Sequence, residues 1–487
     1  MRKGAYYQAA GTICRDELKA LDEAIDFYNL SLDNFFANPD KLSKQMMPRA
    51  LKGFEAIDKI LTTKRDWKAQ ERAYRQMIKR LKQGDRILIS LWDALGEIYR
   101  SRLKHYQSAI SAFEVAQQLD PEGAGRAEIL AELYLVAGPE YADKAVEQHM
   151  RMLKGDALKY ESYKALRRIY QDTHQYDKTW CVCSTLAFLK HADQEEMQFY
   201  EQYKPRGFVK AKNAMNDDVW RRVTHPDENR YIGAILAAIW RGAASIRAQP
   251  HKNLGLRRKD KRAIETDQLV FSRIFNYVAQ VLAMPLPEVY LQHEQPGELF
   301  LANCIDKTEL VPSVVVRSNL LQGRPDKEVA YVCARWLTMM RPEHYLKMAL
   351  PSNTELKTAL LTGIHLAKRD FPLPPDAAQN VALYKPEIEK WLALQPGVFE
   401  QLIRVVNMFL QNPPEVNMAT WGHAVDSTAR RVGFVVSGDL EVAANMARNE
   451  PTVVGGPSQN DKVRDLVLFS VSEDYFAARK ALQLTIG

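Results

Sequence analysis

The sequence WDALGEIYRSRLKHYQSAISAFEVAQQLDP, residues 92–121, decides the fold of the first half of this chain. Its apolar side chains recur every three or four residues, in WDALGEIY and again in AISAFEVA, and this spacing predicts two consecutive amphipathic helices. Gly96 and Ala109 are small residues at the positions where the two helices cross most closely. Pro121 ends the second helix and starts the next unit. The stretch therefore predicts one helical hairpin with an apolar face to bury.

This hairpin resembles the signature of the tetratricopeptide repeat (TPR), W-x2-L-G-x2-Y followed by A-x3-F-x2-A-x4-P, with one extra residue at the inter-helix turn. Weaker copies of the pattern start at four other positions: Tyr7, Phe54, Ala127 and Tyr163. Because one helix pair cannot bury its apolar face alone, these copies predict an array of stacked pairs. The whole chain resembles the C-terminal part of large TPR proteins of myxobacteria and related deltaproteobacteria. The array starts without a polar capping helix, so we expect it to be the end of a longer repeat protein.

Beyond the array the repeat period is lost, and the pattern predicts a second domain. We expect a TPR array over residues 1–205, a helical connector with a basic linker over residues 206–265, and a mostly helical domain over residues 266–487. The short apolar runs VYLQ, ELFLAN and SVVV predict the strands of a small sheet in that domain. Its helical patterns cover residues 326–341, 353–368, 396–411, 418–436 and 461–484. The predicted fold class is mainly α: a TPR-type α-solenoid followed by a mostly helical α+β domain with a small sheet.

Over about residues 285–440 the second domain resembles the core of zincin metallopeptidases of the HtpX and CAAX-protease kind. The family pattern has an Asn after a strand, a second strand, a turn with two leucines, and then an E-x3-V-x2-H-E-x2-H helix. The matching positions before the zinc ligands are Asn303, Ser313 to Val316, Leu320, Leu321, Glu328 and Val332. Where the family has its two zinc-binding histidines, this chain has Arg335 and Met339. Where the family has its catalytic glutamate, this chain has Trp336.

None of these three residues does zincin chemistry. Arg335 repels a cation, Trp336 cannot accept a proton, and Met339 is a poor zinc ligand. The later family helix, E-x2-A-D-R-x-G, corresponds to DSTARRVG, which starts at Asp426 and places Arg430 where the family has its aspartate. The resemblance therefore implies a pseudopeptidase, without metal, cofactor or catalytic residues.

The resemblance to TPR proteins also implies a binding face. The concave face of a TPR array is lined by the first helix of each pair, between its core positions. In this sequence those positions include Asp93, Glu97, Arg100, Glu128, Glu132, Lys164 and Arg168. Their mixed charge favours a polar peptide or protein surface as the partner. We therefore expect a non-catalytic scaffold that binds other proteins or peptides.

Two other functions stay open at this point. The first is a divergent zinc metallopeptidase with the array as its substrate-recruiting domain, in which Asp426 acts with His423 or His344. The second is binding of nucleic acid or an acidic partner through HKNLGLRRKDKR, residues 251–262, which the pattern places in a solvated linker. Metal content tests the first, and the salt dependence of binding tests the second.

Composition narrows the class of protein. The formal net charge of +7 is the small difference between 67 basic and 60 acidic side chains, so it does not predict nucleic-acid binding. The five cysteines lie mostly in apolar helical patterns, which is typical of buried, reduced thiols. No segment approaches the roughly 20 apolar residues of a membrane span, and the first residues lack the apolar core of a signal peptide. We expect a cytoplasmic protein that engages neither membranes nor nucleic acid nor a small-molecule substrate.

Overall fold

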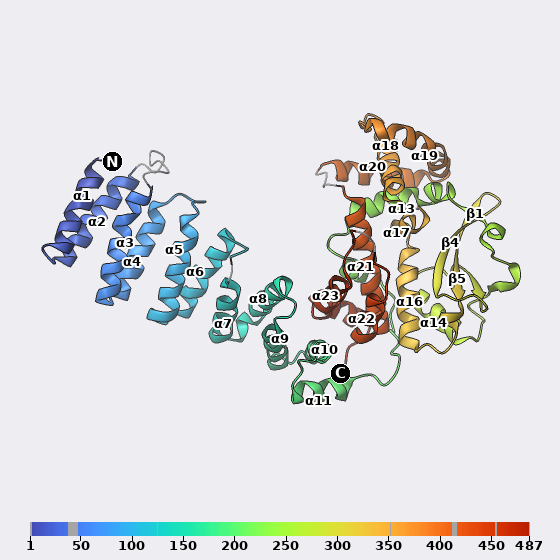
Figure 1. The fold of residues 1–487 in the computed structure, drawn as a ribbon, viewed down its shortest axis with the longest axis horizontal. Helices are drawn as coiled ribbons and strands as arrows, with labels where there is room; N and C mark the ends of the chain where they lie inside the picture. Colours follow the sequence, from blue (N-terminus) through green and yellow to red (C-terminus); the bar gives the residue numbers. More distant parts are fainter. Residues whose placement is uncertain are drawn as a thin grey trace. The chain divides into compact units, whose positions relative to one another are not determined.

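The computed structural model of the protein describes these residues: 2–37, 47–123, 125–350, 352–411, 416–452 and 455–486. Over these residues the chain is mainly α-helical with one small mixed sheet of five strands, so the predicted fold class is confirmed. The chain divides into two compact units, which we name the array unit, Met1–Ile169, and the C-terminal unit, Tyr170–Gly487 (Figure 1). None of the described helices is long and apolar enough to cross a membrane.

The array unit is built from helices that pair along the chain. They are α1 (Arg2–Asp16), α2 (Leu21–Phe36), α3 (Met47–Lys64), α4 (Trp67–Arg80), α5 (Ile87–Glu97), α6 (Tyr106–Leu119), α7 (Arg126–Ala137), α8 (Ala142–Gly155) and α9 (Tyr160–Asp172), within which the division falls. From α1 to α8 each helix packs against the next one along the chain (Figure 1). Packing between successive neighbours is typical of stacked helix pairs.

Small residues set the closest helix crossings in the array unit. A Cβ atom placed on Gly96 would lie 2.8 Å from a ring carbon of Phe113, and one placed on Gly11 would lie 2.9 Å from a ring carbon of Tyr28. The close approach predicted at Gly96 is therefore confirmed, and the first helix pair repeats it. Trp92, the first residue of the repeat pattern, is only half-buried, so the core of its hairpin depends more on the fully buried Phe113.

The extra residue of the central hairpin lies in the helix rather than in the loop. Residues Ile98–Leu103 form a π-helix that continues α5, and a π-turn absorbs one additional residue. The turn that follows is made by Lys104 with a φ of 55°. The turns of three other helix pairs also contain a residue in the left-handed backbone conformation, with φ between 55° and 57°: Lys19, Arg65 and His174. The turn conformation thus recurs with the helix pattern.

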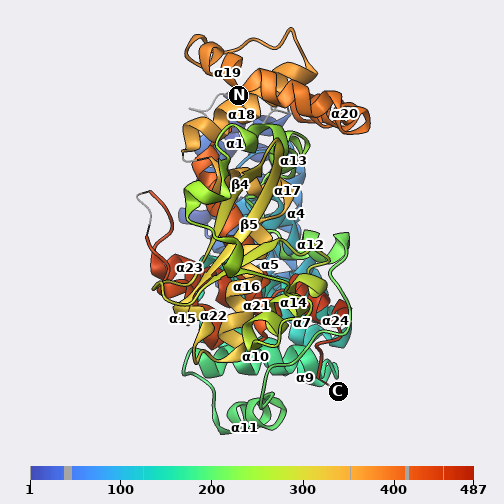
Figure 2. The ribbon, with the colours of Figure 1, turned by 90° about the vertical axis from the view of Figure 1, so that its right-hand side faces the viewer.

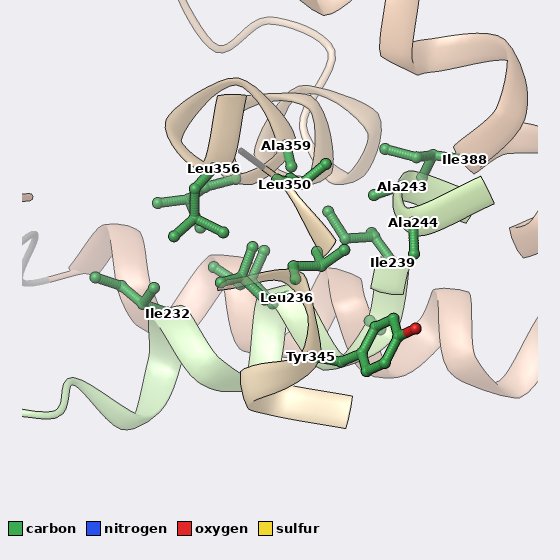
Figure 3. Close-up of a cluster of buried hydrophobic side chains, with 14 of the residues drawn as sticks. Ile232, Leu236, Ile239, Ala243, Ala244, Tyr345, Leu350, Leu356, Ala359 and Ile388 are labelled. Atoms are coloured by element: carbon green, nitrogen blue, oxygen red, sulfur yellow. The ribbon is translucent and has the colours of Figure 1, made fainter. Parts of the chain in front are cut away.

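The C-terminal unit contains the remaining helices. They are α10 (Tyr176–Phe188), α11 (Gln194–Tyr203), α12 (Asp217–Val223), α13 (Arg230–Ser245), α14 (Val270–Val281), α15 (Ser318–Leu321), α16 (Asp326–Met339), α17 (Pro342–Ala349), α18 (Asn353–Ala367), α19 (Pro375–Ala393), α20 (Pro396–Gln411), α21 (Met418–Ser437), α22 (Leu440–Arg448), α23 (Gln459–Ser470) and α24 (Glu473–Ala481). A core cluster surrounds α13, whose Leu236 and Ile239 lie beside Leu350, Leu356 and Ala359 (Figure 3).

The sheet belongs to the C-terminal unit. Its strands are β1 (Gln249–Pro250), β2 (Lys261–Arg262), β3 (Glu288–Gln292), β4 (Leu299–Asp306) and β5 (Glu309–Arg317), in the order β1-β4-β5-β3-β2. β4 and β5 form an antiparallel hairpin, and β3 runs parallel to β5. The three predicted strands are β3, β4 and β5, so these predictions are confirmed. α16 packs against both β4 and α21, so it connects the sheet to α21 (Figures 1 and 2).

The second helix of the fifth predicted pair, α10, is built into the C-terminal unit. The Arg479 guanidinium of α24 donates two hydrogen bonds, of 3.0 and 2.7 Å, to the Asp177 carboxylate at the start of α10. The hydroxyl groups of Thr185 and Ser470 lie 2.9 Å apart. These contacts explain why this unit begins before the predicted end of the array. All five cysteines are buried and free, as predicted.

Some predicted elements differ in the structure. The basic stretch, predicted to be a solvated linker, follows directly after β1 and supplies β2, and these two short strands are the outer strands of the sheet. The helix predicted over residues 461–484 is two helices, because the Ser472 hydroxyl caps the start of α24 by accepting from the Tyr475 N–H. The helix α19 was not predicted, since Pro386 in its interior normally ends a helix.

Candidate functional site

The predicted binding-face residues of the array unit pair with each other and with their neighbours. Arg126 at the start of α7 donates two hydrogen bonds of 2.8 Å to the two carboxylate oxygens of Asp93 on α5. Only 6% of the Arg126 side chain is exposed. This two-pronged geometry is the strong form of an arginine–carboxylate bond, so Asp93 joins two successive helix pairs.

The same face has two further ion pairs between successive first helices. Arg100 contacts Glu97 at 3.0 Å and Glu132 of α7 at 3.6 Å. Glu128 of α7 pairs with Lys159, which directly precedes α9. Because each pair is open to solvent, with about a third or more of most side chains exposed, each contributes about 1 kcal/mol or less. We name these contacts and the Asp93 pair the inter-repeat ion pairs.

The structure thus brings together five of the predicted residues: Asp93, Glu97, Arg100, Glu128 and Glu132. The other two, Lys164 and Arg168, lie on α9, where Lys164 is half-buried and Arg168 is exposed. A polar partner at this face has to replace contacts that are already made within the array.

A groove between α1 and α3 was missed by the sequence analysis. It has a volume of about 810 Å³ and is lined by Ala5, Gln8, Ala9, Thr12, Arg15, Tyr28, Pro48, Arg49, Lys52, Glu55, Ala56 and Lys59. The lining residues of each helix recur three or four positions apart, so each helix presents one stripe to the groove. The cations at positions 49, 52 and 59 were a signal in the sequence, but the repeat copies containing α1 and α3 are weak.

In the C-terminal unit, α16 and α21 pack closely and bring together the residues that match the zincin pattern. A Cβ atom placed on Gly433 of α21 would lie 2.8 Å from the ring of Tyr331 on α16. Beside this crossing lies a group of buried or half-buried charged side chains, which we name the charge cluster: Arg335, Lys347, Asp426, Arg430, Glu450 and Lys462.

Glu450 is the anion that the cations of the charge cluster share. Its carboxylate lies 2.7 Å from Arg335 Nε, 3.0 Å from Arg430 Nη1 and 3.6 Å from Lys462 Nζ. Arg430, of which 2% is exposed, also donates a 2.8 Å hydrogen bond to Ser427 Oγ. Burial alone lowers the pKa of the Arg335 guanidinium, but the Glu450 carboxylate raises it above its ordinary value. Arg335 therefore stays charged at a position where the sequence match placed a zinc ligand.

Asp426, the remaining candidate ligand of that match, pairs with Lys347. Burial alone raises the pKa of Asp426, but Lys347, Arg335 and Arg430 hold it below its ordinary value. A carboxylate surrounded by cations is a poor ligand for a further cation, because Coulomb repulsion opposes metal entry. Within the described residues, no group of three or more His, Cys, Asp or Glu side chains is arranged to hold a metal ion.

Met339 and Trp336, the other two residues at the metal-site positions of the zincin match, also make contacts within the protein. Met339 is buried in the core cluster around α13, with 1% of its surface exposed. The Arg335 guanidinium lies 5.4 Å from the ring centre of Trp336, within the range of a cation–π contact. Asn303, the first residue of the match, accepts a hydrogen bond from the Tyr345 hydroxyl and donates one to the Ala244 carbonyl. It joins β4 to α13 and α17.

His344, one of the two candidate ligands beside Asp426, is held in a buried ion pair. Its Nε2 lies 2.7 Å from Glu228 Oε1, and its Nδ1 lies 3.0 Å from the carbonyl oxygen of Thr338. Both neighbours are hydrogen-bond acceptors, so both ring nitrogens carry hydrogen and the imidazole is a cation. Glu228 also accepts a 2.5 Å hydrogen bond from the Thr428 hydroxyl. His344 in this state cannot bind a metal ion, and His423 lies half-buried on α21.

The basic stretch is exposed and partly paired. Arg257 contacts Asp260 at 2.9 Å, and Lys261 pairs with Glu288 of β3. The other cations, Lys252, Arg258, Lys259 and Arg262, are exposed. Binding of an acidic partner or nucleic acid through this stretch stays a prediction.

Comparison with known proteins does not identify a family for this chain. No protein-family model matches the chain, and the search of curated proteins found no similar protein. The function therefore has to be argued from the inter-repeat ion pairs, the groove and the charge cluster.

Proposed function

We propose that the protein is a non-catalytic scaffold, in which a TPR-type array binds other proteins or peptides and the second domain is a metal-free relative of zincin peptidases. The observation that carries this proposal is the shared contact of Arg335 and Arg430 with Glu450. These arginines occupy positions that in a zincin hold a zinc ligand and an aspartate. Two guanidinium groups that share one carboxylate link α16 and α21 without a metal ion.

The array supports the binding half of the proposal. Stacked helix pairs present one continuous face built from their first helices, as the inter-repeat ion pairs between α5 and α7 illustrate. Such a face suits an extended polypeptide better than a small substrate, because it is long and open. In this proposal the protein works in the cytoplasm and needs no cofactor.

The test is chemical cross-linking of the full chain in extract of its own cells, followed by mass spectrometry. We expect at least one protein to be enriched over a control bait, with its cross-links concentrated on α1, α3, α5 and α7. The competing function is a divergent zinc peptidase that uses Asp426. Enrichment of no protein, together with one tightly bound metal ion per chain, would establish that alternative and reject the scaffold.

A further inference from the structure

The groove between α1 and α3 differs from the rest of the same face in its charge. Of its five charged lining residues four are cations, Arg15, Arg49, Lys52 and Lys59, and one is an acid, Glu55. Further along the array the exposed face has acids and bases in pairs. A site with an excess of one charge attracts a ligand of the opposite charge.

Three of the groove cations lie on α3. Among the described residues, no carboxylate lies within 4 Å of the charged groups of Arg49, Lys52 or Lys59, and all three side chains are exposed. Arg15 is bonded to Asp16 at 2.6 Å. The Arg15 guanidinium, which is hydrogen-bonded to Asp16, holds the pKa of that carboxyl below its ordinary value, and Lys19 and Lys59 add smaller effects in the same direction.

The floor of the groove allows a polypeptide backbone to approach. Ala5, Ala9 and Ala56 line it with methyl groups, and Thr12 and Gln8 add polar groups. The lining part of α1, from Ala5 to Arg15, is about 15 Å long at the helical rise of 1.5 Å per residue. An extended chain covers that length with about four or five residues at 3.3 Å each.

We propose that this groove binds an extended acidic segment of a partner protein, about four or five residues long. The inference rests on the proposed scaffold function and names the chemistry of its partner. A peptide fits better than a nucleic acid, since base binding needs exposed aromatic side chains for stacking. The one aromatic residue that lines the groove, Tyr28, is only 1% exposed, so its ring is not available for stacking with a base.

The test measures fluorescence anisotropy of labelled probes with the full-length chain. The probes are a peptide of about ten alternating Glu and Ala residues, the same peptide with Gln or Lys in place of Glu, and a single-stranded oligothymidylate of similar length. The groove variant is Lys52→Glu with Lys59→Glu. Its matched control is Lys68→Glu with Arg72→Glu on α4, which changes the net charge equally at exposed positions outside the groove. Circular dichroism checks the fold of both.

We expect the Glu peptide to bind more tightly than the Gln and Lys peptides, and the groove variant to weaken this binding at least about tenfold while the control changes it less than about twofold. Equal weakening by both variants, or equal affinity for the Glu and Gln peptides, would overturn the proposal. So would tighter binding of the oligonucleotide. If the groove variant does not fold, Lys52→Gln with Lys59→Gln replaces it.

Failure of this inference is distinct from failure of the scaffold. If the chain cross-links to partner proteins along its first helices but does not bind the acidic peptide, the scaffold function is supported and the groove assignment is wrong. If the chain binds the peptide at the groove but contains one catalytic metal ion per chain, the groove assignment is supported and the non-catalytic function is wrong.

Discussion

Removal of the Glu450 carboxylate probes the charge cluster directly. The Glu450→Ala change leaves three cations without the anion that they share: Arg335, Arg430 and Lys462. Arg430 is 2% exposed and Lys462 is 5% exposed, so neither can recover its lost interaction from water. Removing one partner of a buried ion pair typically costs about 3–5 kcal/mol. We expect the free energy of unfolding of the C-terminal unit to fall by an amount in that range.

Hydrogen exchange followed by mass spectrometry measures this effect within a two-unit chain. Amides of α16 and α21 that exchange through unfolding of the unit should exchange roughly 150- to 5,000-fold faster in the variant, while those of the array unit should not change. The control is Asp218→Ala, which removes a half-exposed carboxylate that pairs with Arg221 and Arg222 on the surface and should cost less than about 1 kcal/mol. Equal effects of the two changes would refute the structural role of Glu450.

Three further predictions concern helix crossing, turn geometry and pH. Gly96→Ala places a methyl group against the Phe113 ring and should destabilise the array unit by about 1–3 kcal/mol in urea unfolding. Lys104→Gly relieves a left-handed backbone and should stabilise that unit by about 1 kcal/mol, whereas Lys104→Ala should not. The pKa of His344 is raised in the folded state by Glu228 against the effect of burial, so this pair stabilises fully below the unfolded pKa of about 6.5 and less as pH rises through the folded pKa. Melting temperatures between about pH 6 and 9 should therefore fall more steeply than in His344→Gln.

Each of these predictions has a clear contrary result. Gly155→Ala, at an exposed position with open space around it, is the control for the first and should be neutral or stabilising by up to about 1 kcal/mol. A harmless Gly96→Ala change would contradict the close crossing. Equal stability of the Gly and Ala variants at Lys104 would show that its backbone costs nothing. A parallel pH dependence in wild type and His344→Gln would mean that the imidazole does not gain its charge on folding.

The array could be predicted from the sequence because its determinants are local. Helical spacing, a small residue at each crossing and a proline after the hairpin all lie within one repeat, so the pattern around Gly96 places both helices correctly. The π-helix at Ile98–Leu103 could not be predicted, since a one-residue insertion fits equally well in a loop. The outer strands escaped prediction for a different reason. They are two residues long and owe their conformation to pairing with β3 and β4.

The candidate sites depend on contacts between distant residues. Spacing placed Arg335 and Arg430 on the two helices that cross, but nothing local to either residue points to Glu450 as their common anion. Glu228 and His344 are 116 residues apart and meet only because α13, which follows Glu228, packs against α17. Asp93, Arg100 and Glu128 of the predicted face pair with residues of the next repeat, which the spacing within one repeat does not specify. Which of them is committed to an ion pair appears only when the helices are stacked.

The most direct test of the central claim is the metal content of the purified chain, measured by inductively coupled plasma mass spectrometry without exposure to chelators. Because a structural or catalytic zinc site binds tightly at neutral pH, a true site would retain its ion through purification. The proposed scaffold, whose Asp426 is surrounded by Lys347, Arg335 and Arg430, predicts less than about one tenth of an equivalent of any transition metal. About one equivalent of zinc per chain would contradict it and return Asp426 to the role of a ligand.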